Sequence, residues 1–239
     1  MNIPFLIHTF WLAIKAIPMT LLITGVSVLI GLPFGFLLAW IKIKKIKILY
    51  PLTIIYTSLM RATPMVLLIL VFYSTLPSLL NVILNRQLHL GIKIFDVNPA
   101  IYAIVVFALI AVANLSEVFR SAILTVDPGQ QEAAMMVGLS PLQTYYRIIV
   151  PQALVSAIPN IGNLTLNILK GTSLAFMMTV QEVTAVAKTA AAYTYDYTEA
   201  YIDIFIVYFI LGAILQLGFK FLERYLSRHK IRGTVRQGA

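Results

Sequence analysis

The sequence predicts an all-α integral membrane protein with five transmembrane helices, an expectation that rests first on composition. Of its 239 residues, 60% are hydrophobic and only 11% are charged, and the mean hydropathy is +0.89. These values lie outside the range of soluble domains. Five stretches are long and apolar enough to cross a bilayer as helices, which takes about 20 residues each. An odd number of crossings places the termini on opposite sides.

The five predicted helices lie within one transmembrane domain that covers residues 1–239. Their approximate ranges are 17–41, 57–80, 99–124, 148–180 and 201–222. In the first, Gly31 and Gly35 share a stripe with small hydroxyl residues, which favours close packing against another helix. The second begins near Arg61, which we interpret as an interfacial anchor in preference to a gate contact.

Basic residues predict the orientation of the helices. Most of the Lys and Arg residues fall on one side of the predicted helices, and short loops rich in these residues stay in the cytoplasm. The N-terminus is therefore expected outside and the C-terminus in the cytoplasm. The cations on the predicted cytoplasmic side are Lys42, Lys44, Lys45, Lys47, Arg61, Arg120, Arg147, Lys220, Arg224, Arg228, Lys230, Arg232 and Arg236.

A polar interruption at residues 127–147 separates the third and fourth helices. Asp127 is a good N-cap, Pro128 suits the first helical position, and Gln130 stands where a capping-box Gln belongs. Gly138 is a natural helix end, and the segment Ser140-Pro141-Leu142-Gln143 repeats the start signal. The stretch therefore predicts two short cytoplasmic helices with a bend between them.

The first of these short helices resembles a docking element in its residue types. Ala133 and Ala134 are small, and Glu132 is its one acid. If both alanines are exposed, another protein surface can approach the helix backbone closely. We therefore expect this segment to contact a partner protein.

The predicted fourth helix carries a polar stripe. Its members are spaced by four, three, four and three residues, so they share one face of an otherwise apolar helix. Polar side chains in a membrane helix usually face a bundle interior or a wet cavity, and ionisable ones mark transport paths. The residues of the stripe are Ser156, Asn160, Asn163, Asn167 and Lys170.

The same helix is too long for one straight span, and the segment Lys170-Gly171-Thr172-Ser173 predicts a break. Free amides at the start of a second half-helix, with Thr172 and Ser173 beside the Lys170 ammonium, suit the carboxylate of a small solute. Two alternatives remain open. Lys170 can extend to the outer interface, and the Asn side chains can bond neighbouring helices.

The predicted third helix carries Asn114, Glu117 and Arg120. Glu117 and Arg120 are three residues apart and are expected to pair near the inner surface. Asn114 lies deeper in the helix. It is a candidate for the translocation path, although an interhelical hydrogen bond explains it equally well.

The sequence offers no catalytic constellation. The three histidines are scattered, no metal-binding spacing is present, and cysteine is absent. There is also no P-loop motif of the type GxxxxGK[ST], so ATP is not expected to bind to this chain. We therefore predict no enzyme and no bound cofactor. Energy for uphill transport would come from another chain or from an ion gradient.

Several motifs resemble the membrane subunits of bacterial ABC importers, specifically the histidine/glutamine-type polar amino acid permease family. The resemblance covers about residues 17–225, and its central pattern is Glu132-Ala133-Ala134, a glycine four residues after the last alanine, and a hydrophobic run to a proline. The matching segments are Arg61–Pro64, Glu117–Arg120, Val126–Gln130, Glu132–Ala134, Gly138–Ser140, Gln143–Thr144, Pro151–Ala153 and Lys170–Leu174.

This resemblance implies a multi-pass subunit of the bacterial cell membrane whose element 127–147 is the coupling helix. Contact with a separate ATPase then falls to Glu132, Ala133, Ala134 and Gly138. The family implies a second permease subunit, either identical or different, two ATPases that hold ATP and Mg, an external solute-binding protein, and no role for nucleic acid. Its solute is usually a polar L-amino acid or a close derivative.

The chain departs from the common family pattern in three places. Asn114 and Ser116 stand where Tyr and Ala are frequent, Gly171 follows Lys170 where Asp is frequent, and Ala62 replaces a usual Gly. The Asn114 variant and the external loop resemble permeases for cystine and similar sulfur amino acids. The alternative to an ABC permease is an ATP-independent secondary carrier or channel subunit for small polar solutes.

Overall fold

The computed structural model describes the backbone of residues 1–234 and the side chains of residues 1–226. The predicted cytoplasmic cations Arg228, Lys230, Arg232 and Arg236 therefore lie outside the described side chains. Across the described residues the regular structure is helical, and no strand is present. The α-helices are α1 (Ile3–Lys44), α2 (Leu49–Ala62), α3 (Met65–Leu80), α4 (Pro99–Leu124), α5 (Pro128–Met136), α6 (Pro141–Thr144), α7 (Val150–Gly171), α8 (Val183–Thr194) and α9 (Tyr197–Thr234).

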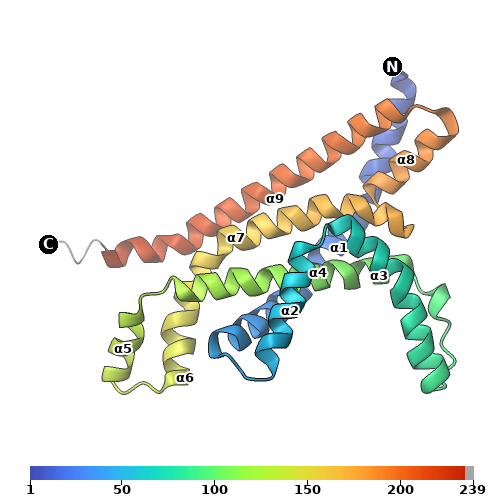
Figure 1. Ribbon diagram of the computed structural model, residues 1–239. Coiled ribbons are helices and arrows are strands. Elements are labelled where there is room, and N and C mark those ends of the chain that lie inside the picture. Colours follow the sequence, from blue (N-terminus) through green and yellow to red (C-terminus); the bar gives the residue numbers. More distant parts are fainter. Residues whose placement is uncertain (235–239) are drawn as a thin grey trace.

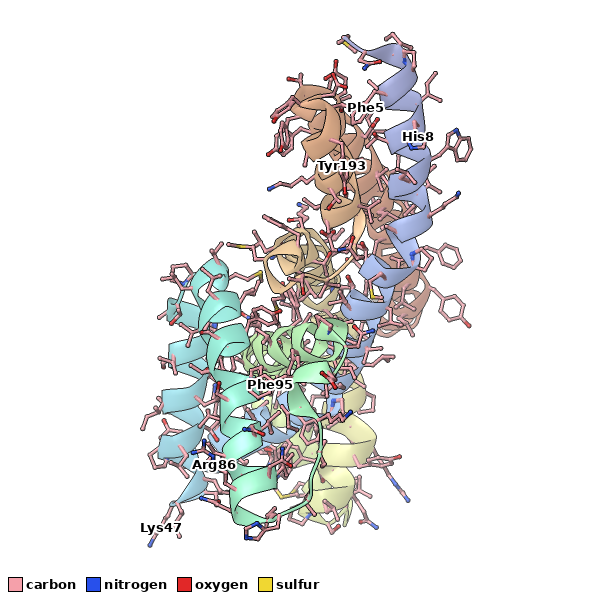
Figure 2. The ribbon with its side chains drawn as sticks, turned by 90° about the vertical axis from the view of Figure 1, so that its right-hand side faces the viewer. Phe5, His8, Lys47, Arg86, Phe95 and Tyr193 are labelled. Atoms are coloured by element: carbon pink, nitrogen blue, oxygen red, sulfur yellow. The ribbon has the colours of Figure 1, made fainter. Side chains whose placement is uncertain are left out.

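Four shorter turns of helix connect these elements. Two are π-helical, η1 (Asn81–Gln87) and η3 (Tyr145–Ile149), and two are 3-10 helical, η2 (Ile94–Asp96) and η4 (Thr172–Met178). In Figure 1, α4, α7 and α9 run beside one another, and α5 and α6 project from the end of α4. The N-terminal end of α1 lies against α8, where Phe5, His8 and Tyr193 line one groove (Figure 2).

Five helical segments are long and apolar enough to cross a membrane, as the sequence predicted. They are Ile3–Lys44, Met65–Gln87, Pro99–Leu124, Pro141–Met178 and Tyr197–Leu226. The first segment begins earlier than expected, because Asn2 caps α1 by accepting a hydrogen bond from the Phe5 amide at 3.2 Å.

The predicted second helix, 57–80, is not one helix. Thr63 is extended, with ψ of 132°, and separates α2 from α3. The physical cause is Pro64, whose ring disfavours a helical conformation in the residue before it. Only the part from Met65 onward contributes to a candidate membrane span.

The break expected near residues 170–173 has a different form from the prediction. No second half-helix begins there, because the chain continues from α7 into the 3-10 turn η4. Thr172 and Ser173 donate their hydroxyls backwards to the carbonyls of Leu169 and Lys170, at 2.6 and 2.8 Å. The next α-helix starts at Val183, and its cap is Glu182.

The largest helix contact in the molecule joins α1 to α4, which run in the same direction. A Cβ built on Gly31 would lie 2.8 Å from Leu115 Cδ1, and one on Gly35 would lie 2.6 Å from Leu115 Cβ. The two glycines therefore bring the helix backbones together, as expected from the sequence. Parallel packing also places the basic turn after α1 and the α5–α6 element at the same end of the bundle.

Substituting Gly35 with Ala is expected to lower the free energy of unfolding by about 1–3 kcal/mol, the usual cost of overpacking. The added methyl also meets the Leu115 carbonyl carbon at 3.2 Å, and backbone cannot rotate away. Thermal unfolding of the purified permease measures the change. Gly25→Ala on the same helix is the control, since no atom lies within 4 Å of its Cβ. Equal losses in both variants would contradict the close α1–α4 contact.

Candidate coupling element and polar stripe

The segment between α4 and α7 folds as two short helices with a bend. Asp127 caps α5 by accepting the Gly129 amide at 2.7 Å, and Pro128 is its first residue. Gly138 has φ of +85°, which ends the helix in a conformation that favours glycine. A full capping box joins Ser140 to Gln143 at the start of α6.

Two details of this segment differ from the sequence prediction. The Gln130 side chain makes no capping box with Asp127; its oxygen instead accepts from the Gln152 amide at 3.4 Å, which ties α5 to α7. Ala134 is buried rather than exposed, because α5 packs its inner face against η3. Glu132, Ala133 and Gly138 are exposed, so three of the four predicted contact residues remain available to a partner.

The same segment exposes large apolar side chains that the sequence analysis did not select. Their exposed fractions run from 74% to 88%, and they surround the bend at the tip of the element. Apolar groups gathered at a protruding tip are typical of a protein interaction surface. The signal in the sequence was the run of apolar residues directly before Gly138. The four residues are Met136, Val137, Leu142 and Tyr146.

The polar stripe of α7 lies on the outside of the described chain. Asn160, Asn163, Asn167 and Lys170 are exposed, and their side chains make no hydrogen bond to the residues that the structure describes. Asn163 also lines a groove of about 300 Å³ between α7 and α9, opposite Gln216, Lys220 and Glu223. The stripe therefore leaves three side-chain amides and one ammonium group available to a solute or to another subunit.

Asn114 and Thr172 do not join the stripe. Asn114 is half-buried on α4, and its amide donates to the Ile110 carbonyl of the same helix at 2.9 Å. Thr172 is fully buried, and its hydroxyl lies 3.3 Å from the Tyr208 hydroxyl of α9. Ser173 is half-buried at the end of the stripe. The structure thus brings together four of the seven predicted path residues and places Ser173 next to them.

A buried acid that the sequence analysis overlooked organises the other end of the bundle. Glu182 is fully buried and accepts the amides of Thr184 and Ala185, each at 2.8 Å, and the Tyr208 hydroxyl at 2.9 Å. It lies between the fourth and fifth candidate spans. Burial raises the pKa of this carboxyl, and the hydrogen bonds it accepts lower the pKa again in part. Glu182 therefore fixes the start of α8 against α9.

Lys42 is a second residue whose position the sequence did not reveal. It was grouped with the cytoplasmic cations, but it is only 4% exposed and its ammonium lies 2.5 Å from Glu117 Oε1. The ammonium also donates to the Thr57 and Ser116 hydroxyls at 2.8 and 3.1 Å. Arg120 Nε contacts Glu117 Oε2 at 2.9 Å, so the predicted Glu117–Arg120 pair is present within a larger network.

Two of the departures from the family pattern therefore have structural explanations. Ser116 supplies a hydroxyl to the buried Lys42 and does not face the stripe. Gly171 is buried, and a Cβ there would lie 2.5 Å from Met65 Sδ and 3.3 Å from a Phe107 ring carbon. An Asp at this position would need the Met65 side chain to move and would crowd the Phe107 ring. Both positions affect packing between helices.

Comparison with known proteins agrees with this architecture. Residues 31–231 match the family model described as binding-protein-dependent transport system inner membrane component. The chain is 40% identical to the L-cystine transport system permease protein TcyL of Bacillus subtilis (strain 168), over 72% of this chain and 70% of that protein. It is 35% identical to the probable amino-acid permease protein YxeN of the same organism, over 81% of each.

Solved structures show the same fold. The crystal structure of an amino acid ABC transporter with histidines matches with a TM-score of 0.75 and 27% identity, over 90% of this chain and 94% of that one. The inward-facing MetNI methionine ABC transporter matches with a TM-score of 0.69 at 18% identity, which supports the fold alone. The chain therefore belongs to the inner membrane components of binding-protein-dependent transport systems and is a multi-pass transport subunit of the bacterial cell membrane, not an enzyme.

Proposed function

We propose that this chain forms the translocation path of an ATP-driven importer for a polar L-amino acid, with a cystine-type sulfur amino acid as the first solute to test. The observation that carries the proposal is the α5–α6 element, which projects from one end of the bundle and exposes an apolar tip (Figure 1). A transport subunit without a P-loop needs such a surface to receive energy from another chain. The relatives named for amino acids and L-cystine support the solute class.

The proposed ATPase contact consists of Glu132, Ala133, Gly138 and the exposed apolar tip, and Ala134 supports it from inside. Residues Asn160, Asn163, Asn167 and Lys170 would face the path, with Ser173 at its end. Amides can donate to and accept from a zwitterionic solute, and the ammonium attracts its carboxylate. Their exposure and lack of partners within the described chain support this role.

The proposed assembly contains a second permease subunit, two ATPases and an external solute-binding protein. An exposed polar stripe is costly against lipid, so a second permease subunit facing α7 would enclose it. ATP and Mg would be bound by the ATPases. The coupling element would move with them, and the helix bundles would open the path alternately to each side.

The decisive experiment is ATP hydrolysis by the purified permease–ATPase complex in lipid, with its binding protein, across a panel of amino acids that includes cystine. Stimulation by one member is expected and would identify the solute. Assembly without stimulation by any amino acid would contradict the solute class. Uptake that continues without the ATPase would contradict the coupling mechanism.

Replacing Lys170 with Ala is expected to reduce solute-stimulated ATP hydrolysis without loss of assembly. A charge-assisted hydrogen bond to a carboxylate contributes roughly 1.5–3 kcal/mol, so the half-saturating solute concentration should rise about 10- to 100-fold. The titration is run with saturating binding protein. Lys15→Ala is the matched control, because Lys15 is an exposed lysine of α1 that does not line the groove of Asn163. Unchanged kinetics in the Lys170 variant would favour an interfacial anchor.

A further inference from the structure

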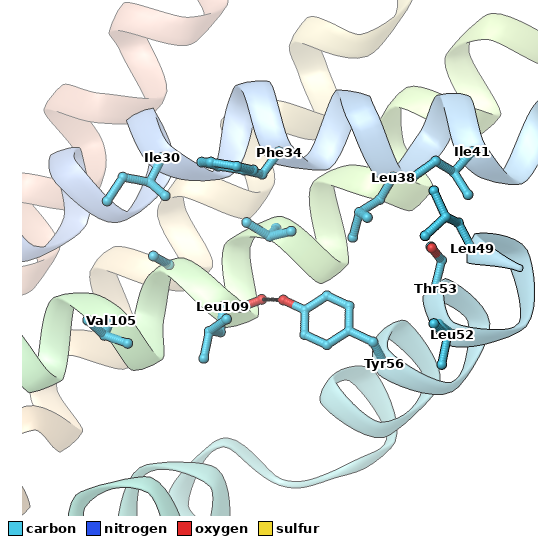
Figure 3. A pocket seen from close by; sticks show the side chains of 12 residues that line it. Ile30, Phe34, Leu38, Ile41, Leu49, Leu52, Thr53, Tyr56, Val105 and Leu109 are labelled. Atoms are coloured by element: carbon cyan, nitrogen blue, oxygen red, sulfur yellow. Dashed lines mark hydrogen bonds between the residues drawn. The ribbon is translucent and has the colours of Figure 1, made fainter. Parts of the chain in front are cut away.

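An open apolar groove lies between α1, α2 and α4, on residues that neither the coupling element nor the polar stripe uses. Its volume is about 540 Å³, within the range of roughly 300–1,000 Å³ that small-molecule sites occupy. Figure 3 shows Ile30, Phe34 and Leu38 along one wall and Tyr56 crossing toward α4. The groove is therefore a defined cavity in the side of the bundle.

The walls of the groove suit a hydrocarbon chain. Its only polar lining residues are Thr53 and Tyr56, and the Tyr56 hydroxyl is already satisfied by the Leu109 carbonyl at 2.6 Å. Phe34 and Leu52 remain 56% and 59% exposed at the rim. A polar solute would find no free hydrogen-bonding partner at Tyr56, whereas an acyl chain would cover exposed apolar surface.

The length of the groove matches one leaflet of a bilayer. From Ile30 to Ile41 the wall formed by α1 extends roughly 16 Å, at about 1.5 Å per residue. Half of a bilayer hydrocarbon core is about 15 Å. The groove also ends at Ile41 and Leu49, on either side of the turn that joins α1 to α2. An acyl chain in the groove would therefore have its headgroup beside this turn.

That turn carries cations without counter-charges. Lys45 and Lys47 are exposed, and among the described residues no carboxylate lies within ion-pair distance of either. The Lys47 side chain extends away from the body of the molecule (Figure 2). The Lys44 ammonium is engaged over the rings of Trp40 and Tyr145, at 5.1 and 4.6 Å from their centroids. Two lysines without a carboxylate partner among the described residues thus lie on the turn that joins the α1 and α2 walls of the groove.

We propose that this groove binds an anionic phospholipid, with an acyl chain between α1, α2 and α4 and its phosphate beside Lys45 and Lys47. The acyl chain then contacts apolar side chains and the phosphate lies beside ammonium groups. The length of the groove along α1 also fits a single leaflet. A helix of the partner permease would cover the apolar walls but would leave the two lysines without an anion. The headgroup charge therefore favours a lipid.

Native mass spectrometry of the permease–ATPase complex tests the proposal. The complex is released from nanodiscs that contain equal amounts of phosphatidylglycerol and phosphatidylcholine, and the retained lipids are counted. The wild-type complex is expected to retain phosphatidylglycerol preferentially. Lys45→Gln with Lys47→Gln should reduce this preference about 30-fold, which corresponds to about 1 kcal/mol for each lysine near an anionic surface.

Matched variants separate the headgroup from the groove. Arg86→Gln with Lys93→Gln removes the same charge from the loop before α4 and should leave the preference unchanged. Ala108→Phe fills the groove from α4 and should reduce retention of both lipids; Leu52→Trp at the exposed rim serves the same purpose if that variant does not fold. Equal retention of the two lipids by the wild type, or no effect of the lysine or groove variants, would overturn the proposal.

The partner permease is tested directly as the alternative occupant. The chain has no cysteine, so Phe34→Cys places a single thiol at the rim of the groove, to which a maleimide-benzophenone photo-cross-linker is attached. No photo-cross-link to the partner permease is expected on illumination if lipid occupies the groove. An efficient cross-link would assign the groove to the partner subunit and overturn the lipid site.

Discussion

Replacing Gly138 with Arg is expected to abolish uptake while the permease still folds and inserts. Gly138 is exposed at the bend between α5 and α6, and the long cation would project into the ATPase surface that we propose to dock there. Loss of about 2 kcal/mol at such a contact weakens ATPase binding roughly 30-fold. Co-purification of the ATPase and solute uptake by proteoliposomes measure the two effects.

Two smaller substitutions at the same position separate the effect of side-chain size on the proposed ATPase contact from the effect of backbone strain on stability. Gly138 has φ of +85°, where an L-residue costs about 1–2 kcal/mol and Asn is tolerated better than Ala. Gly138→Ala should therefore lower stability but retain most of the coupling, and Gly138→Asn should resemble the wild type. Normal uptake in the Arg variant would remove the α5–α6 bend from the coupling surface.

Replacing Glu117 with Gln is expected to cost about 3–5 kcal/mol of unfolding free energy, the usual penalty for leaving a buried charge without its partner. Lys42 is the charge concerned, because its side chain is only 2% exposed and would keep only neutral acceptors, the hydroxyls of Thr57 and Ser116 and the new amide oxygen. Denaturant unfolding of the purified permease in micelles measures the change. The loss is large enough to lower the yield of folded protein.

Variants at the other charges of this network test the assignment. Arg120 is 38% exposed, so Arg120→Gln should cost at most about 1 kcal/mol. Adding Lys42→Met to Glu117→Gln should recover much of the loss, because the unpaired ammonium is removed. A larger effect from Arg120→Gln than from Glu117→Gln would show that Lys42 does not depend on Glu117.

Local chemistry made several elements predictable from the sequence. The Asp127 cap, the Ser140 capping box and the Gly138 bend depend on residues a few positions apart. The break at Thr63 was equally local, but the apolar stretch around it dominated the prediction. One proline hardly changes a hydropathy value averaged over a window. It nevertheless disfavours a helical conformation in the residue before it, which here is Thr63.

The candidate sites were predictable only where a single helix carries them. The spacing of Asn160, Asn163 and Asn167 alone determines that they share a face. Lys42 is buried because Glu117 lies beside it, 75 positions later in the chain, and sequence spacing contains no sign of that contact. Glu182 was missed for a related reason, since its partner Tyr208 belongs to α9.

The chain from Pro141 to Met178 has a mechanical consequence. Its 38 residues are helical throughout, as α6, η3, α7 and η4 follow one another without a loop. One end of this segment belongs to the α5–α6 element that we propose contacts the ATPase, its middle carries the Asn stripe, and its other end contacts Tyr208 through Thr172. We therefore expect a displacement of α6 to be transmitted along this helical segment to the polar stripe. The π-helical turn η3 lies near the end formed by α6, and we expect the segment to bend there.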